Sequence, residues 1–160
     1  MDGISEILAT YNCVSLDEKI QFELDGVVEK EIKQAYCIEN LEFCVSCMDY
    51  TTLKVSDTEE SVKNFTADLL KKLKKFNLRD VAAVCVFSNY AGIVREGLKG
   101  TEIQTAVVAG NFPNSQTFTE IKLAECKMAI GAGAQEVDVV ISVGDILEKN
   151  CLLYTSDAAD

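Results

Sequence analysis

Hydrophobic and polar positions along most of this chain alternate between two patterns. Short apolar runs without regular polar alternation predict strands buried on both faces, as in a parallel sheet. We expect such strands at 41–48, 81–87, 103–108 and within 131–141. The run at 131–141, Gly-Ala-Gly-Ala-Gln-Glu-Val-Asp-Val-Val-Ile, combines a helix stop at Gly131 or Gly133 with a β-branched segment.

Between these runs, apolar residues recur at helical spacing, which predicts helices. Ser56 and Asp57 are expected to open a helix, 89–98 forms the next, and Thr117 with Glu120 caps a third. The expected apolar faces are Val62, Phe65, Leu69 and Leu73 in the first helix and Ile121, Ala124 and Met128 in the third. Residues 1–40 read as a helical extension, with Ile4, Ile7, Leu8 and Tyr11 at helical spacing and a capping box at Ser15 and Glu18.

Alternation of strands and helices predicts parallel βαβ units, in an open doubly wound sheet or a closed barrel. No Gly-x-Gly-x-x-Gly follows the first strand, which disfavours dinucleotide binding. Polar residues instead follow the strands: Asp49, Thr51, Ser88, Asn89, Asn111 and Ser142. In a (β/α)8 barrel that face carries the chemistry, and the whole barrel takes roughly 250 residues. Residues 41–150 would therefore supply about the first four βα units.

Composition narrows the class of protein. The chain has 160 residues, 48% of them hydrophobic, and a formal net charge of −11, which fits one globular domain. An acidic surface disfavours binding to nucleic acid or to anionic membranes. The basic run at 71–75 reads as the solvated face of a helix. Without an apolar run of membrane-spanning length or a signal-like N-terminus, we expect a cytoplasmic protein.

Cysteine and histidine usage argues against a metal site. The seven Cys are irregularly spaced, and Cys44 and Cys47 form the single Cys-x-x-Cys within an apolar run. The chain has no His to complete a zinc site, so we interpret these Cys as reduced core thiols. Acid–base chemistry would have to use carboxylates, Lys, Tyr or Cys.

Asp138 is the residue that does not fit its surroundings. It interrupts the β-branched run, and a carboxylate buried between sheet faces costs several kcal/mol unless a charge or hydrogen bond compensates it. A functional carboxylate and a structural one that caps a neighbouring loop both remain open on the pattern alone.

Four motifs follow one another along the chain: Met48-Asp-Tyr-Thr-Thr-Leu53, Ala82-Ala-Val-Cys-Val-Phe87, the stretch 107–113 with its Asn-Phe-Pro, and 131–141. In this order they resemble the motifs of the deoxyribose-phosphate aldolases, class I aldolases of the (β/α)8 type. The resemblance covers about 41–150. It implies cleavage of 2-deoxy-D-ribose 5-phosphate, a small sugar phosphate, to D-glyceraldehyde 3-phosphate and acetaldehyde, without metal or organic cofactor, in deoxynucleotide breakdown.

The resemblance also implies residue roles. In the family a Lys on the sixth strand forms a Schiff base and a second Lys on the seventh lowers its pKa, while a strand Asp, matched by Asp138, moves a proton. Asp49 and Thr51 match positions at the mouth of the site, and Cys85 matches a Cys close to it. Both family lysines would lie beyond this chain. Lys54 alone follows a strand directly, without a second cation to activate it.

The last ten residues, 151–160, break the family pattern. They are the translation of TGTCTCTTATACACATCTGACGCTGCCGAC, which resembles a transposase sequencing adapter, so we expect a non-native tail and exclude it from fold reasoning. The sequence then predicts a fragment that is inactive alone. Two alternatives stay open: a non-catalytic half-barrel that acts by association, as a homodimer or with a separately encoded half, and another Schiff-base barrel enzyme.

Overall fold

The computed structural model describes residues 13–32 and 35–148, in two compact units, 1–42 and 43–160, which are considered separately. The first contains α2 (Cys13–Val27) and a π-helical turn, η1 (Val28–Ile32). Ser15 lies inside α2, so the predicted capping box at Ser15 and Glu18 is wrong. The helical spacing at Ile4 to Tyr11 lies outside the described residues.

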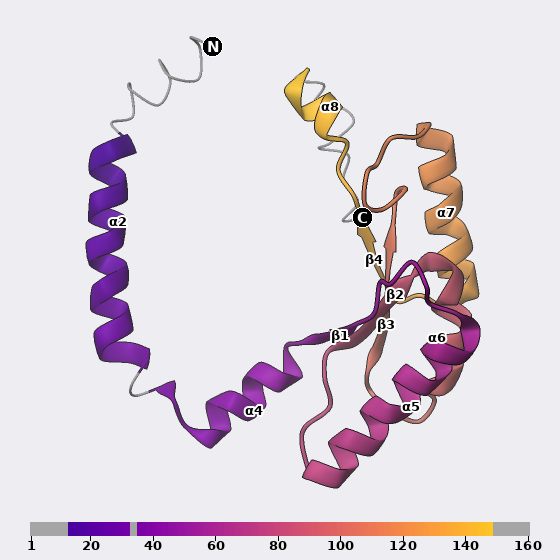
Figure 1. The fold of residues 1–160 in the computed structure, drawn as a ribbon, viewed down its shortest axis with the longest axis horizontal. Coiled ribbons are helices and arrows are strands. Elements are labelled where there is room, and N and C mark those ends of the chain that lie inside the picture. Colours follow the sequence, from indigo (N-terminus) through magenta and orange to yellow (C-terminus); the bar gives the residue numbers. More distant parts are fainter. Residues whose placement is uncertain (1–12, 33–34, 149–160) are drawn as a thin grey trace. The chain divides into compact units, whose positions relative to one another are not determined.

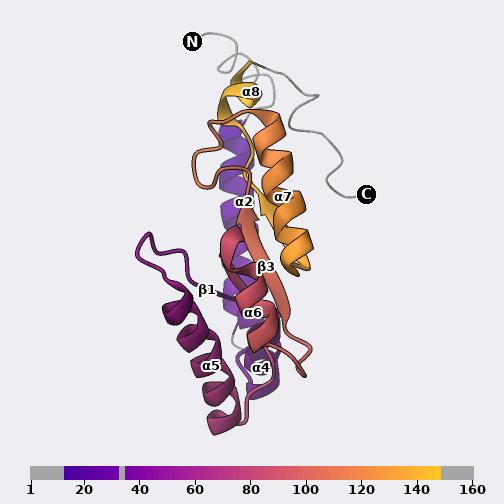
Figure 2. The same cartoon turned by 90° about the vertical axis from the view of Figure 1, so that its right-hand side faces the viewer.

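The second unit is built on a parallel four-stranded sheet in the order β1-β2-β3-β4. Its strands are β1 (Asp49–Thr51), β2 (Ala83–Phe87), β3 (Gln104–Ala109) and β4 (Glu136–Val139). The connecting helices are α5 (Glu59–Phe76), α6 (Ala91–Gly97), which follows the 3₁₀ turn η2 (Ser88–Tyr90), and α7 (Thr119–Ala132). All three lie on one side of the sheet (Figures 1 and 2), and α8 (Val143–Leu147) follows β4. The predicted parallel α/β fold is confirmed.

The first predicted strand, 41–48, is wrong. That segment belongs to α4 (Ile38–Ser46), and β1 covers three residues after it. The strand ladder begins only at Met48, whose carbonyl accepts from the Ala82 N–H at 3.0 Å. Before this point the backbone satisfies itself within a helix, as the 3.1 Å bond from the Leu41 N–H to the Cys37 carbonyl shows. Cys44 and Cys47 are consequently exposed free thiols and not core residues.

Helix α5 follows the predicted pattern with a later start. Thr58 is its N-cap, and a capping box joins Thr58 to Ser61, so the predicted start at Ser56 and Asp57 is two residues early. Asp57 instead organises the loop after β1: its Oδ2 accepts from the Thr52 hydroxyl and the Lys54 N–H, both at 2.9 Å. The predicted face is confirmed, with Val62, Leu69 and Leu73 buried and Phe65 half-buried.

Helix α7 departs from prediction at its start and agrees at its end. Phe118 is the N-cap and gives no side-chain bond, so Thr117 and Glu120 do not cap it. Gly133 ends the helix at φ 111°, in the left-handed region, as one of the two predicted stops. The predicted face formed by Ile121, Ala124 and Met128 is exposed in this chain.

The two faces of the sheet carry different residues. Because side chains alternate along a strand, the register assigns one set to the side covered by helices and another to the opposite side, which we call the helix-free face. The covered side holds the main core, which includes Val84, Val86 and Val107 with Val62, Leu69, Val94 and Leu98 of the helices. The helix-free face holds Asp49, Thr51, Ala83, Cys85, Phe87, Gln104, Ala106, Val108, Glu136 and Asp138.

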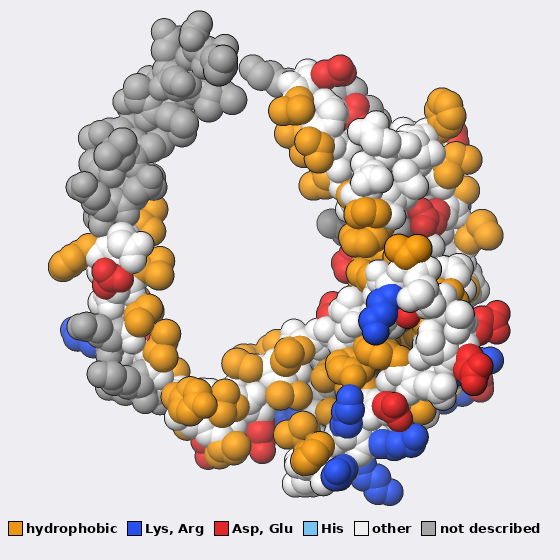
Figure 3. All heavy atoms as spheres, viewed as in Figure 1, with side chains coloured by type: hydrophobic (Ala, Val, Ile, Leu, Met, Phe, Trp, Pro, Cys, Tyr) orange, Lys and Arg blue, Asp and Glu red, His pale blue; other side chains and the backbone are white. Residues whose placement is uncertain are grey.

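Basic and hydrophobic side chains gather at different places on the surface. Figure 3 shows Lys and Arg side chains collected over the end of α5, and hydrophobic side chains along the segment from β4 to α8. The exposed hydrophobic residues of that segment are Val139, Ile141, Val143, Ile146 and Leu147. No helix among the described residues is long and apolar enough to cross a membrane.

Candidate active site

The structure brings the four predicted site residues onto one face. Thr51 pairs with Cys85 in the β1–β2 register, and Val108 pairs with Asp138 in the β3–β4 register. Asp49 lies two residues before Thr51 on the same face. In the register Asp49 lies level with Ala83, the first residue of β2, Thr51 lies level with Cys85, and Asp138 lies level with Phe87, the last residue of β2. The four residues therefore share the helix-free face at successive levels along the strands.

The pKa of the Cys85 thiol depends on the charges on this face. The Cys85 side chain is buried, and burial, followed by the negative charges of Asp138 and Asp49, raises the pKa of the Cys85 thiol from an ordinary 9.0 to about 11. A hydrogen bond with Thr51 acts in the opposite direction. At neutral pH Cys85 is therefore a neutral thiol among carboxylates and not a nucleophile.

Asp138 is exposed, which contradicts the prediction of a buried carboxylate. The cause is its strand: within the described residues β4 pairs with β3 alone, and α5, α6 and α7 all lie on the opposite side of the sheet (Figure 1). The desolvation argument for Asp138 therefore does not apply to the chain by itself. The sequence pattern assumed that both faces of this strand are covered, and among residues 43–148 the helices cover only the other face.

Lys54 lies in the loop after β1 and is exposed. Its backbone N–H, and not its side chain, takes part in the Asp57 network. Schiff-base lysines are activated by desolvation in an apolar pocket or by a neighbouring cation, and an exposed loop position offers no desolvation.

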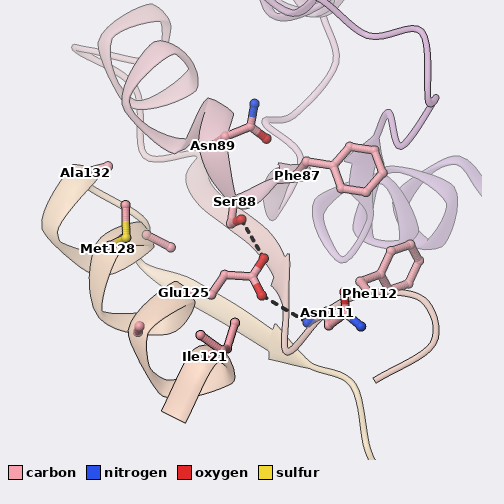
Figure 4. Close-up of a pocket in the computed structure, with 11 residues that line it drawn as sticks. Phe87, Ser88, Asn89, Asn111, Phe112, Ile121, Glu125, Met128 and Ala132 are labelled. Carbon is pink, nitrogen blue, oxygen red and sulfur yellow. Dashed lines mark hydrogen bonds between the residues drawn. The ribbon is translucent and has the colours of Figure 1, made fainter. Parts of the chain in front are cut away.

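A hollow of about 740 Å³ opens beside the carboxyl ends of β2 and β3, against α7. Figure 4 shows Ser88, Asn111 and Glu125 converging at its wall, with Met128 and Ile121 along the helix. Ser88 donates its hydroxyl to Glu125 Oε1 at 2.8 Å, and the N–H groups of Gly110 and Asn111 donate to Oε2 at 3.0 Å each. None of the four predicted site residues lines this hollow.

Glu125 is the residue that sequence analysis missed. Ser88 and Asn111 had been singled out as polar positions after strands, but their shared partner lies on α7. A signal was present: Glu125 sits between Ala124 and Met128, so a carboxylate interrupts an expected apolar helix face.

Comparison with known proteins gives similar proteins that share one name. A deoxyribose-phosphate aldolase from Clostridium novyi (strain NT) is 43% identical over 102 residues, 64% of this chain and 42% of that protein. One from Treponema denticola is 36% identical over 110 residues, 69% of this chain and 47% of the relative. This part of the chain is homologous to deoxyribose-phosphate aldolases. No protein-family model matches the chain.

A solved structure supports the same assignment. The crystal structure of a protein assigned as a deoxyribose-phosphate aldolase, from Coccidioides immitis, matches with a TM-score of 0.60 and 26% identity. The match covers 70% of this chain and 41% of that one. The chain thus has the α/β fold of these aldolases but spans less than half the length of the curated relatives it matches.

Proposed function

We propose that residues 41–150 are the first half of a deoxyribose-phosphate aldolase barrel. The whole protein cleaves 2-deoxy-D-ribose 5-phosphate to D-glyceraldehyde 3-phosphate and acetaldehyde in the cytoplasm, without metal or organic cofactor. The observation that carries this proposal is that Asp49, Thr51, Cys85 and Asp138 all lie on the helix-free face. These residues match the aldolase motifs and arrive together from three different strands.

Asp138 is the proposed proton donor and acceptor. In the complete barrel, later strands cover the helix-free face and bring the Schiff-base Lys toward it. A carboxylate beside cationic nitrogens is compensated, and its pKa can be adjusted for proton transfer through water. Asp49 and Thr51 then belong to the polar network around substrate, and Cys85 is a buried neighbour of that network.

The chain alone is proposed to be inactive. A Schiff-base Lys is activated by desolvation or by a neighbouring cation, and Lys54 is exposed to solvent. We place the reactive Lys beyond residue 150, and we retain the proposal that 151–160 is a non-native tail; residues 149–160 lie outside the described part of the chain.

Borohydride trapping tests the proposal. A chimera would carry residues 41–150 of this chain in place of the matching part of the Clostridium novyi relative, which supplies the remaining strands. The chain alone and the chimera are each incubated with 2-deoxy-D-ribose 5-phosphate and borohydride, and the modified Lys is located by peptide mass mapping. A Lys54→Met version of each provides the control.

We expect no adduct on the chain alone and one adduct on a Lys of the relative's part of the chimera. Lys54→Met should change neither result. An adduct on Lys54 would contradict the assignment of the Lys, and a folded chimera without any adduct would contradict the function.

A second candidate, association without catalysis, is favoured by one observation. Among the described residues β1 pairs only with β2 and β4 only with β3, so the sheet has two free edges. Two copies could close eight strands. However, a homodimer would gather Asp49, Glu136 and Asp138 from both copies on one enclosed face, where like charges repel each other. We therefore rank it below the aldolase.

A further inference from the structure

The loop from Gly110 to Ser115, between β3 and α7, has an unusual backbone conformation. Gly110 has φ 78°, Asn111 φ 63° and Ser115 φ 57°, all in the left-handed region. Side-chain-bearing L residues rarely adopt this region, although Asn tolerates it better than most. At Gly110 a Cβ would also lie 3.0 Å from Val139 Cγ1. Gly110 adopts this region readily, whereas Asn111 and Ser115 depend on contacts to hold it.

Glu125 holds the beginning of the loop. Its Oε2 accepts the consecutive N–H groups of Gly110 and Asn111, both at 3.0 Å. Its Oε1 accepts the Ser88 hydroxyl at 2.8 Å, so one half-buried carboxylate joins α7 to the ends of β2 and β3 (Figure 4). Hydrogen bonds to an ionised acceptor are stronger than those between neutral groups.

Lys122 holds the end of the loop. It precedes Glu125 by nearly one helical turn, so both side chains leave the same face of α7. The Lys122 ammonium donates to the hydroxyl oxygen of the buried Ser115 at 2.7 Å. Ser115 in turn donates to the Val140 carbonyl, just after β4, at 2.8 Å.

The loop carries an aromatic side chain onto the helix-free face. The ring centroids of Phe112 and Phe87 are 6.2 Å apart, in an edge-to-face arrangement. Both rings pack against the small cluster formed by Ala83, Cys85, Ala106 and Val108. Val108 is the register partner of Asp138, so Phe112 packs on a cluster that includes a direct strand neighbour of the proposed proton-transfer residue.

We propose that Glu125, with Lys122, is a positioning residue that fixes the loop 110–115 and so holds Phe112 over the candidate active site. The inference rests on the proposed function for the reaction which that face serves. Glu125 itself does not touch the face; it acts through the backbone of Gly110 and Asn111. A helix on the covered side of the sheet thereby sets the geometry of the opposite face.

The neutral analogue of Glu125 distinguishes positioning from proton transfer. In Glu125→Gln the amide oxygen can accept both backbone N–H groups, and the amide nitrogen can donate to Ser88, whose hydroxyl oxygen accepts. The contacts survive without an ionisable group. Glu125→Ala removes all three contacts, and Glu120→Ala, at an exposed position of the same helix, makes the same change in net charge without touching the loop.

Hydrogen exchange followed by mass spectrometry tests this on the full chain. For Glu125→Ala we expect exchange in peptides covering 110–115 to rise roughly 10- to 100-fold while peptides covering 83–87 and 104–109 keep parental rates, because only the loop is released. Alkylation of Cys85 should rise with it. Glu125→Gln should stay within roughly threefold of the parent, Glu120→Ala should match it, and Lys122→Met should accelerate only the 113–115 end.

In the chimera described above, Glu125→Ala should lower kcat/KM by roughly 10- to 100-fold and Glu125→Gln should restore most of it. Three results would overturn the inference: unchanged loop exchange in Glu125→Ala, equal disruption by Glu125→Gln, or faster exchange throughout both strands, which would make Glu125 a general stabilising residue. The exchange readout needs no activity. An inactive chimera with the expected exchange pattern would therefore contradict the proposed function alone.

Discussion

The pKa of the Cys85 thiol shows the effect of the charges on the helix-free face more directly than any property of the carboxylates themselves. Cys85 is buried between strands, and the charges that act on its pKa come from Asp138 and Asp49 on two different strands. The thiol can therefore be used as a probe of whether these carboxylates share one site, without requiring catalysis.

The pH dependence of Cys85 alkylation should reflect its pKa of about 11. Below this pH the rate should rise about tenfold per pH unit, because the thiolate is the reacting species. Asp138→Asn removes a negative charge and should shift the profile to lower pH; Thr51→Val removes a hydrogen bond that lowers the pKa and should shift it upward. Peptide mass mapping after iodoacetamide treatment measures both shifts, with urea-unfolded chain as the reference. A profile unmoved by Asp138→Asn would separate Asp138 from this site.

Asp138→Asn in the chimera should reduce turnover roughly 10²- to 10⁴-fold, the usual loss on removing a general acid or base. The amide fills the same space but cannot exchange the proton. Glu136→Gln, two residues earlier on the same strand face, is the matched control and should cost less than roughly tenfold. Steady-state kinetics on the two variants gives the comparison. Equal losses of turnover would mean that Asp138 contributes only its negative charge, as Glu136 does, and does not transfer a proton.

At the residue scale the sequence predicted which residues share a face better than it predicted their environment. It placed Cys85 and Asp138 within strands and Asp49 and Thr51 just after one, whereas the structure has Asp49 and Thr51 inside β1 and puts all four on one face. Their role in a site stays a prediction. The burial of Asp138 could not be predicted, because it depends on strands and helices that would cover β4 and not on the residues around Asp138. Glu125 was missed because its partners, Ser88, Gly110 and Asn111, lie on two other segments and two of its bonds go to backbone.

At the element scale, strands with a partner on each side were predicted well and the first strand was not. The runs at 81–87 and 103–108 became β2 and β3, which pair on both edges. The run at 41–48 is equally apolar but became α4, because a strand is stabilised by a ladder and this segment has no partner before Met48. Periodicity alone does not separate a short buried strand from a helix segment.

The end of α7 offers a matched pair of glycine substitutions. Gly133→Ala should lower the free energy of unfolding by about 1 kcal/mol or more, because φ is 111° and the new Cβ would meet Arg95 Cγ at 3.0 Å. Gly131→Ala should raise it by about 0.5–1 kcal/mol, since Gly131 lies within the helix and its Cβ would meet nothing within 4 Å. Urea unfolding of the chimera at one temperature measures both. Stabilisation by Gly133→Ala would contradict the assigned helix end.

At the scale of the whole molecule, the chain has more apolar surface and free sheet edge than a stable monomer usually shows. Val139, Ile141, Val143 and Leu147 are exposed along and after the edge strand β4. Unpaired edges of this kind recruit other chains. The net charge of −11 opposes association only over the screening distance of the buffer.

We therefore expect the chain alone to self-associate, and the chimera, which supplies neighbours for β1 and β4, to remain monodisperse. Sedimentation velocity across a concentration series, with a thermal scan of each sample, makes the comparison. A chain that sediments as a single monomer and melts cooperatively would contradict this expectation.

The central claim is that residues 41–150 are a working first half of a deoxyribose-phosphate aldolase. The most direct test is the release of acetaldehyde from 2-deoxy-D-ribose 5-phosphate by the chimera. We predict a kcat/KM within roughly a hundredfold of the Clostridium novyi relative, because small misplacements at the grafted boundary cost up to about that factor. A chimera that is folded and monodisperse but releases no acetaldehyde above the level of the chain alone would contradict the account.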